Sequence, residues 1–349
     1  MLTIRSPQLK LLERLCNAVA VSGDEGEVRK IVLEQVTPYA DEVRVDALGN
    51  VLVRKRGSKR NRPNVMLASH MDEVGFMVVS DEGEGFFRFV KVGSLDMTMM
   101  AGKPVVIGRE HTPAVIGMTP IHLLDEEDRA KTVNVDGLRF DVGSATGIQV
   151  GDRATFATRF RRVGPSIFAK AIDDRLGVAT LIELLKHAPD NVDLSLAFTV
   201  QEEIGSRGAG AAAHAFAPDI AIAVDCTLAR DLPNPNGENT IYNTKLDHGP
   251  AIYLSQASAL NDPRLVRFFE QTAQAEEIPC QIRQPGGGGT DADAMNQQLE
   301  GIPTLSISVP GRYIHTPIGL CRVADWQNTL RLPHAGLSRM TPALLKRYT

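Results

Sequence analysis

Four short runs of apolar residues along the chain each stop at polar side chains. They span residues 65–68, 194–200, 220–224 and 304–309. Uninterrupted apolar runs of this length are typical of strands that are buried on both faces of an α/β sheet. Between these runs, residues 175–187 and 263–277 have a helix-like pattern. The alternation predicts an α/β domain in which helices cover a central sheet.

The N-terminal part of the chain predicts two helices and two short strands. Apolar residues recur at helical spacing over residues 9–19. Ser22 and Glu25 have the spacing of a capping box, so we expect a second helix over residues 24–36. Residues 43–53 then read as two strands on either side of a turn at Gly49.

Residues 75–164 have a different pattern. Strand-like pieces at 86–92, 104–107, 114–118 and 153–157 are separated by turns rich in Gly and Asp. This pattern is typical of a small β-barrel or sandwich. We therefore predict an inserted β domain over residues 75–164, and a discontinuous α/β domain formed by residues 1–74 and 165–349.

Composition excludes several classes of partner. The chain has 349 residues, 38 basic and 42 acidic, which gives a net charge of −4 and argues against nucleic acid or an anionic membrane as the main partner. No uninterrupted apolar segment resembles a signal peptide or a membrane span, so we expect a cytoplasmic protein. The four cysteines form no CxxC pair or disulfide framework, and we expect them to be reduced.

Candidate metal ligands follow the apolar runs. Ligands of open α/β sheets collect at the carboxyl ends of the strands, where these side chains would meet. Two imidazoles and three carboxylates suit two divalent metal ions, with one carboxylate bridging the pair. The candidates are His70, Asp173, one of Glu202 and Glu203, Asp225 and His315.

Two further acidic positions complete this candidate site. Asp72 lies two residues beyond His70, where it could accept a hydrogen bond from the second ring nitrogen and fix the tautomer. Glu202 and Glu203 point in opposite directions if the segment is extended. Only one is then expected to bind metal, while the other could act as a general base. Spacing does not decide between them.

Six motifs of the chain occur in the order found in one peptidase family. The chain resembles the tetrahedral (TET) aminopeptidases of metallopeptidase family forty-two, which includes glutamyl aminopeptidases and proteins labelled endoglucanases. The motifs are ASHMDEVGF (68–76), KAIDDR (170–175), VQEEIG (200–205), VD (224–225), GGTDA (288–292) and RYIHTP (312–317).

The resemblance implies a metal-dependent aminopeptidase with a pair of Zn²⁺ or Co²⁺ ions that removes N-terminal residues from short peptides. It assigns His70 and Asp225 to one ion and Glu203 and His315 to the other. Asp173 would bridge the two ions. The remaining roles are Glu202 as the general base and Asp72 as the residue that orients His70.

The resemblance also implies an architecture and an assembly. The fold would be a three-layer mixed sheet with flanking helices. The inserted β domain would mediate dimerisation, and six dimers would form a tetrahedral dodecamer. No nucleic acid or membrane partner is implied.

Three other functions stay open. An aminoacylase or carboxypeptidase could use a similar dinuclear site. A glycoside hydrolase needs two carboxyl groups flanking a sugar bond, and this chain has few sugar-stacking aromatics, with one Trp and five Tyr. A metal-free regulatory scaffold is the third. The preferred N-terminal residue is also open: Arg207, Lys245 and Arg312 are available for an acidic side chain, but the sequence does not place them.

Overall fold

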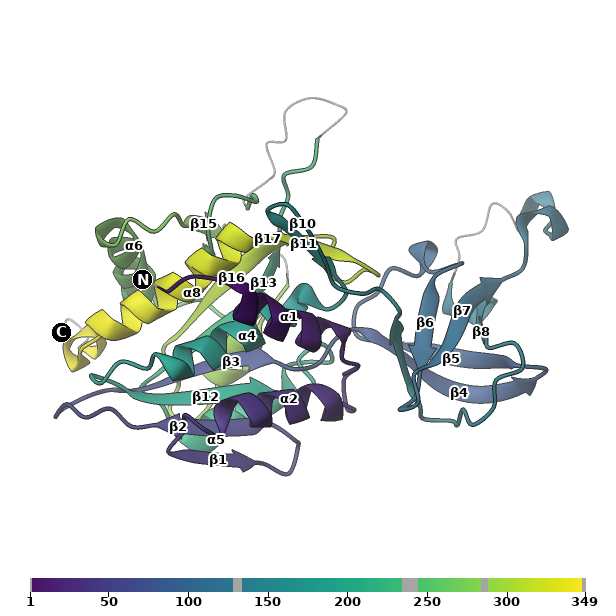
Figure 1. Cartoon of the computed structure of the whole chain (residues 1–349). Coiled ribbons are helices and arrows are strands. Elements are labelled where there is room, and N and C mark those ends of the chain that lie inside the picture. The colour runs from purple at the N-terminus through teal and green to yellow at the C-terminus, as the bar shows by residue number, and fades with distance from the viewer. Residues whose placement is uncertain (1, 128–133, 234–243, 284–287, 347–349) are drawn as a thin grey trace.

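The computed structural model describes residues 2–127, 134–233, 244–283 and 288–346. A large mixed sheet with helices on both faces lies beside a smaller closed barrel (Figure 1). The predicted fold class is confirmed: an α/β fold with flanking helices and an additional small β-barrel.

The four apolar runs form adjacent parallel strands at the centre of the large sheet. Nearly every residue of these strands is buried, as expected for strands covered on both faces. Antiparallel strands extend the sheet on both sides. In sheet order the strands are β1 (Glu42–Val45), β2 (Val51–Lys55), β12 (Asp193–Thr199), β3 (Asn64–His70), β13 (Ile220–Leu228), β16 (Thr304–Arg312), β17 (Gly319–Arg322), β11 (Ser166–Ala169) and β10 (Arg161–Val163).

Two short strands are attached beside this path. β14 (Ala251–Tyr253) pairs antiparallel with β16, and β15 (Gln281–Arg283) pairs parallel with β14. Ala251 and Ile252 lie opposite Ser308 and Ile307, so β14 and β15 run toward the amino-terminal end of β16.

Helices cover both faces of the large sheet. One face carries α1 (Ser6–Asn17), α2 (Gly26–Val36), α4 (Ile172–Lys186) and α8 (Val323–Arg339). The other face carries α5 (Arg207–Phe216) and α7 (Asp291–Asn296), while α6 (Pro263–Ala275) packs on α8 and β14. None of the helices in the described ranges is both long and apolar enough to cross a bilayer.

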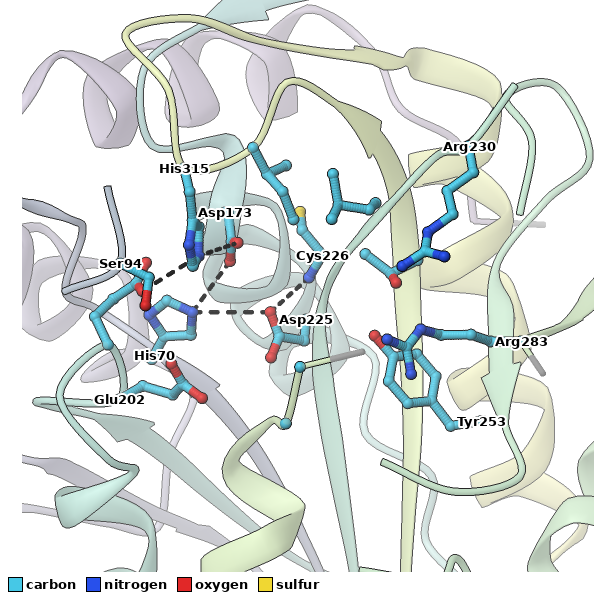
Figure 2. Close-up of a pocket in the computed structure, with 16 residues that line it drawn as sticks. His70, Ser94, Asp173, Glu202, Asp225, Cys226, Arg230, Tyr253, Arg283 and His315 are labelled. Atoms are coloured by element: carbon cyan, nitrogen blue, oxygen red, sulfur yellow. Dashed lines mark hydrogen bonds and ion pairs between the residues drawn. The ribbon is translucent and has the colours of Figure 1, made fainter. Parts of the chain in front are cut away.

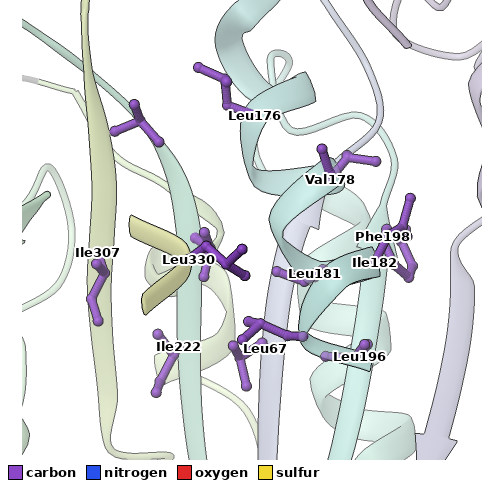
Figure 3. Close-up of a cluster of buried hydrophobic side chains, with 14 of the residues drawn as sticks. Leu67, Leu176, Val178, Leu181, Ile182, Leu196, Phe198, Ile222, Ile307 and Leu330 are labelled. Carbon is purple, nitrogen blue, oxygen red and sulfur yellow. The ribbon is translucent and has the colours of Figure 1, made fainter. Parts of the chain in front are cut away.

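The main core lies between α4 and the parallel strands. Leu181 and Ile182 of α4 pack with Leu67 of β3 and Ile222 of β13 (Figure 3). The helix is buried along almost its whole length, which explains why most of its residues after Arg175 are apolar. The start of α4 is thereby held firmly at the edge where the parallel strands end.

The smaller unit is a closed six-stranded barrel. Alternate residues of β5 and β7 are buried, so each strand directs every second side chain into the barrel. Phe76, Phe89, Phe140 and Phe156 pack together inside it. The strands are β4 (Gly75–Gly83), β5 (Phe86–Val92), β8 (Leu138–Asp141), β7 (Thr112–Met118), β6 (Pro104–Ile107) and β9 (Arg153–Phe156).

The predicted capping box at Ser22 is wrong. Helix α2 begins at Gly26, and Glu25 occupies the N-cap position. The Ser22 hydroxyl instead donates a 2.6 Å hydrogen bond to the Asp72 carboxylate. The Ser22 side chain therefore makes a tertiary contact with a residue 50 positions away in the sequence, although the local pattern predicts that it caps the helix.

A buried ion-pair network joins the barrel to the α/β unit. The Glu73 carboxylate accepts hydrogen bonds from Lys170 at 2.8 and 2.9 Å and from Arg175 at 3.1 Å. It also accepts from the Thr155 hydroxyl of β9 and from the backbone N–H of Ala20. Burial raises the pKa of Glu73, but the two cations outweigh this effect and hold the pKa below its usual value.

We predict that Glu73→Gln lowers the free energy of unfolding by roughly 3–5 kcal/mol, because two buried cations lose their counter-charge. Urea unfolding measures this change. Glu276→Gln is the matched control, because Glu276 pairs with Arg339 at the surface and should contribute less than about 1 kcal/mol. Equal effects of the two substitutions would contradict the stabilising role of the buried network.

Candidate metal centre

The predicted ligands lie together at the carboxyl ends of the parallel strands (Figure 2). His70 is the last residue of β3, and Glu203 and His315 lie in the segments that follow β12 and β16. Asp173 lies in the first turn of α4, where its dihedral angles are not helical. Asp225 was expected directly after its strand, but β13 continues to Leu228, so Asp225 lies inside the strand.

Asp173 lies between the two imidazoles. One carboxylate oxygen, Oδ1, is 3.2 Å from Nε2 of His70. The other, Oδ2, is 3.4 Å from Nε2 of His315. Each oxygen therefore faces a different histidine, which is the arrangement that a bridging carboxylate requires.

Two clusters of ligand atoms share this aspartate. His70, Asp173 and Asp225 form one, and Asp173, Glu203 and His315 form the other, with the ligand atoms of each cluster within 4.8 Å of one another. Nε2 of His70 lies 3.7 Å from Asp225, and Nε2 of His315 lies 3.2 Å from Glu203. Imidazole nitrogen and carboxylate oxygen are donors that Zn²⁺ and similar divalent ions accept, so these residues fit a metal site.

Asp72 connects one cluster to the segment that follows β12. Nδ1 of His70 is 3.2 Å from the backbone carbonyl of Asp72 and 3.5 Å from its carboxylate. The same carboxylate accepts hydrogen bonds from the backbone N–H groups of Glu202 and Glu203 at 3.0 and 3.2 Å, in addition to the hydroxyl of Ser22. Asp72 thus contacts His70 and also fixes the backbone that carries both glutamates.

The crowding of carboxylates changes the pKa values of the site. Burial and the charge of Asp173 raise the pKa of Glu203 to about 8, against the lowering effect of His315. Burial lowers the pKa of His315, but contact with Asp173 and the charge of Glu203 outweigh it and raise the pKa to about 9. Burial also raises the pKa of Glu202 well above its usual value. The raised pKa values of the carboxyl groups show that ionising all of them in this buried cluster is costly, and bound cations would offset that cost.

A cavity of about 400 Å³ opens beside the two clusters. The clusters and Glu202 line one side, and Arg230, Tyr253 and Arg283 line the other (Figure 2).

None of Arg207, Lys245 and Arg312, the three basic residues considered from the sequence, is among the residues that line this cavity. Arg312 instead pairs with Asp231 at 2.7 Å. No motif or periodicity marks Arg230 and Arg283, so their place in the cavity was not predicted from the sequence.

Asp291 is a second residue to which the sequence analysis gave no role. It is buried at the first position of α7 and accepts a hydrogen bond from the Thr199 hydroxyl at the end of β12. Burial is the main cause that raises its pKa to about 7. The GGTDA motif contains Asp291 and was the signal that could have identified it.

Comparison with known proteins shows to which family the chain belongs. The sequence model of the M42 glutamyl aminopeptidase family matches residues 49–332, a range that includes every candidate ligand. The chain belongs to the M42 family. M42 peptidases are metal-dependent, and membership supports aminopeptidase activity, a hydrolase function.

Individual M42 relatives match along almost the whole chain. The lysyl aminopeptidase of Pyrococcus furiosus is 33% identical over 347 residues, covering 95% of this chain and 97% of the relative. The crystal structure of a TET aminopeptidase from Thaumarchaeota archaeon SCGC AB-539-E09 has a TM-score of 0.92 at 32% identity, with 97% and 98% of the two chains covered. The Pyrococcus horikoshii TET1 peptidase has a TM-score of 0.83 at 29% identity, with 95% and 100% covered.

The pKa values predict how pH affects the stability of metal-free protein. Folded Glu203 keeps its proton up to about pH 8, whereas an unfolded glutamate loses it near pH 4.3. The folded state then binds more protons over this range, so stability falls as pH rises. The pKa of His315 is about 6.5 in the unfolded state and about 9 in the folded state, so the titration of His315 also lowers stability as pH rises.

We therefore expect the melting temperature of chelator-treated protein to decrease from pH 5 to pH 8.5. Glu203→Gln should weaken this pH dependence, because the substituted side chain does not titrate. Differential scanning calorimetry in a pH series measures both effects. A melting temperature that rises over this range would be inconsistent with the raised pKa values.

Proposed function

We propose that this M42 protein is an aminopeptidase that hydrolyses the first peptide bond of short peptides with two Zn²⁺ or Co²⁺ ions per chain. His70 and Asp225 would hold one ion, Glu203 and His315 the other, and Asp173 both. The observation that carries this proposal is the position of Asp173, whose two oxygens face one histidine each at 3.2 and 3.4 Å.

When bound, the two ions would polarise the scissile carbonyl and lower the pKa of a water molecule toward neutrality. Glu202 lines the cavity beside both clusters and is the proposed general base. It would accept a proton from the attacking water and deliver it to the leaving amine. Its burial favours the protonated form, which suits the second of these transfers.

Asp72 and the carboxylates of the cluster have supporting roles in this mechanism. Asp72 would keep His70 oriented and hold the backbone of Glu202 in place, through the contacts at 3.2 and 3.0 Å. A carboxylate beside the ions, or one of the ions, would hold the free α-amino group of the peptide. This contact would favour peptides with an unblocked N-terminus.

The alternatives have weaker support. Among the described residues that line the cavity, Tyr253 is the only Phe, Tyr or Trp, which does not favour stacking against a sugar. A scaffold without metal would not need two complete donor sets that share a carboxylate. An aminoacylase with a similar site differs mainly in the group that it accepts at the substrate N-terminus.

We also propose that residues 75–164 form an inserted dimerisation domain, with residues 1–74 and 165–349 as the catalytic domain, and that dimers assemble into a tetrahedral dodecamer. Large apolar side chains are exposed on and beside the barrel, as on interaction surfaces; they include Phe86, Val90, Met99, Val115, Met118 and Leu123. The related P. horikoshii TET1 peptidase can assemble into a tetrahedron or a large octahedral shell.

Substrates with free and blocked N-termini test the proposed activity. The purified protein should release p-nitroaniline from aminoacyl p-nitroanilides and leave their N-acetyl forms uncut. A chelator should abolish the activity, and Zn²⁺ or Co²⁺ should restore it. Cleavage of the acetylated substrates would favour an aminoacylase, and chelator-resistant release of reducing sugar would favour a glycoside hydrolase.

Glu202→Gln tests the proposed base. We expect kcat to fall roughly 100- to 10,000-fold, because proton transfer is lost. Metal content, measured by mass spectrometry, should stay at two ions per chain. Asp173→Asn should lose metal as well as activity, because it removes the shared ligand.

Asp190→Asn serves as the control for these substitutions, since Asp190 pairs with Lys59 at the surface. This variant should keep both metal and activity. Near-full activity of Glu202→Gln with both ions bound would disprove the role of Glu202.

A further inference from the structure

Arg283 lies on the side of the cavity opposite the metal ligands (Figure 2). It is the last residue of β15, and in the register of the two strands it is paired with Tyr253, the last residue of β14. This pairing explains why its guanidinium lies 4.2 Å from the centre of the Tyr253 ring. Stacking on the ring holds the planar group against the wall of the cavity.

The charge of Arg283 has no counter-ion within the described part of the chain. The residue is only 8% exposed, and Nη1 is buried without a hydrogen-bond partner. Across residues 2–127, 134–233, 244–283 and 288–346, no carboxylate forms an ion pair with it. Buried arginines are ordinarily paired, because an unpaired buried charge is costly. A ligand that carries an anionic group would supply the missing partner.

Arg230 lines the same side of the cavity and approaches it from the segment that follows β13 (Figure 2). The cavity is therefore polar in a specific sense, with carboxylates and histidines on one side and two guanidinium groups on the other. A substrate that binds beside the metal ligands through its amino end and carries an anionic group farther along matches this distribution.

We propose that Arg283, assisted by Arg230, binds a carboxylate of the substrate and so selects peptides whose first residue is Glu or Asp. This inference rests on the proposed aminopeptidase function. With the α-amino group and the scissile bond at the acidic side, the first side chain can extend across the cavity toward the arginines. A guanidinium binds a carboxylate through two parallel hydrogen bonds and repels a lysine or arginine side chain.

The test compares kcat/KM for the p-nitroanilides of Glu, Asp, Leu and Lys. The wild-type enzyme should prefer Glu and Asp over Leu and Lys. Arg283→Met keeps an unbranched side chain but removes its charge, and should lower the Glu-to-Leu ratio roughly 10- to 100-fold. Arg283→Glu should raise the Lys-to-Glu ratio above that of the wild type.

These readouts are ratios within one variant, so a reduced fraction of folded enzyme cancels. Arg267→Met is the matched control, because Arg267 is exposed on α6 and does not line the cavity. It should leave both ratios unchanged. Ratios that stay the same in Arg283→Met and Arg283→Glu would overturn the proposal.

A second arm identifies the source of the carboxylate, because a dipeptide also has one at its C-terminus. Leu-Gly and its C-terminal amide are compared in wild type and Arg283→Met. A loss confined to the free dipeptide, with the Glu-to-Leu ratio unchanged, would overturn selection of the first side chain and assign Arg283 to the C-terminal carboxylate. Hydrolysis of the four p-nitroanilides by the wild type separates the two proposals: if none is cleaved, the aminopeptidase function fails, and if at least one is cleaved, only the selectivity is in question.

Discussion

Two adjacent buried carboxylates, Asp72 and Glu73, lie where β3 leaves the large sheet and the chain enters the barrel. Buried charge is tolerated only where partners offset it, so each carboxylate fixes the groups around it. Glu73 binds Lys170 and Arg175 and reaches Thr155 in the barrel. Asp72 contacts His70 and binds the backbone of the segment that follows β12. The corner that joins the two units of the fold therefore also sets the position of the candidate metal ligands.

The two sets of buried acids differ in how their charge is offset. Glu73 has two cationic side chains of the same chain within 3.1 Å. Asp173, Glu203 and Asp225 have only the imidazoles of His70 and His315. The first set is complete without a ligand, which is what a structural role requires. The second has more carboxyl groups than imidazoles to pair with them, so all of its carboxyl groups can ionise only with added positive charge, and this is the physical reason to infer that it binds cations.

The sequence predicted the central strands and the candidate ligands because both depend on local pattern. A strand buried on both faces is mainly apolar, and parallel neighbours bring their following residues to one edge. Ser22 was misassigned because its cap-like spacing carries no information about Asp72, 50 residues away. Arg283 and Tyr253 were missed because β14 and β15 have three residues each, too few for a recognisable period. Their position depends on long-range pairing with β16.

Different structural elements form the two sides of the cavity. Its acidic side is formed by residues at the ends of the parallel strands and at the start of α4, which the main core holds rigid. Its basic side comes from β15, which pairs only with β14, and from the segment after β13. A substitution at Arg283 changes the charge that faces the substrate without altering any strand that carries a metal ligand. Substrate choice and hydrolytic chemistry can therefore change independently in this fold, because different structural elements determine them.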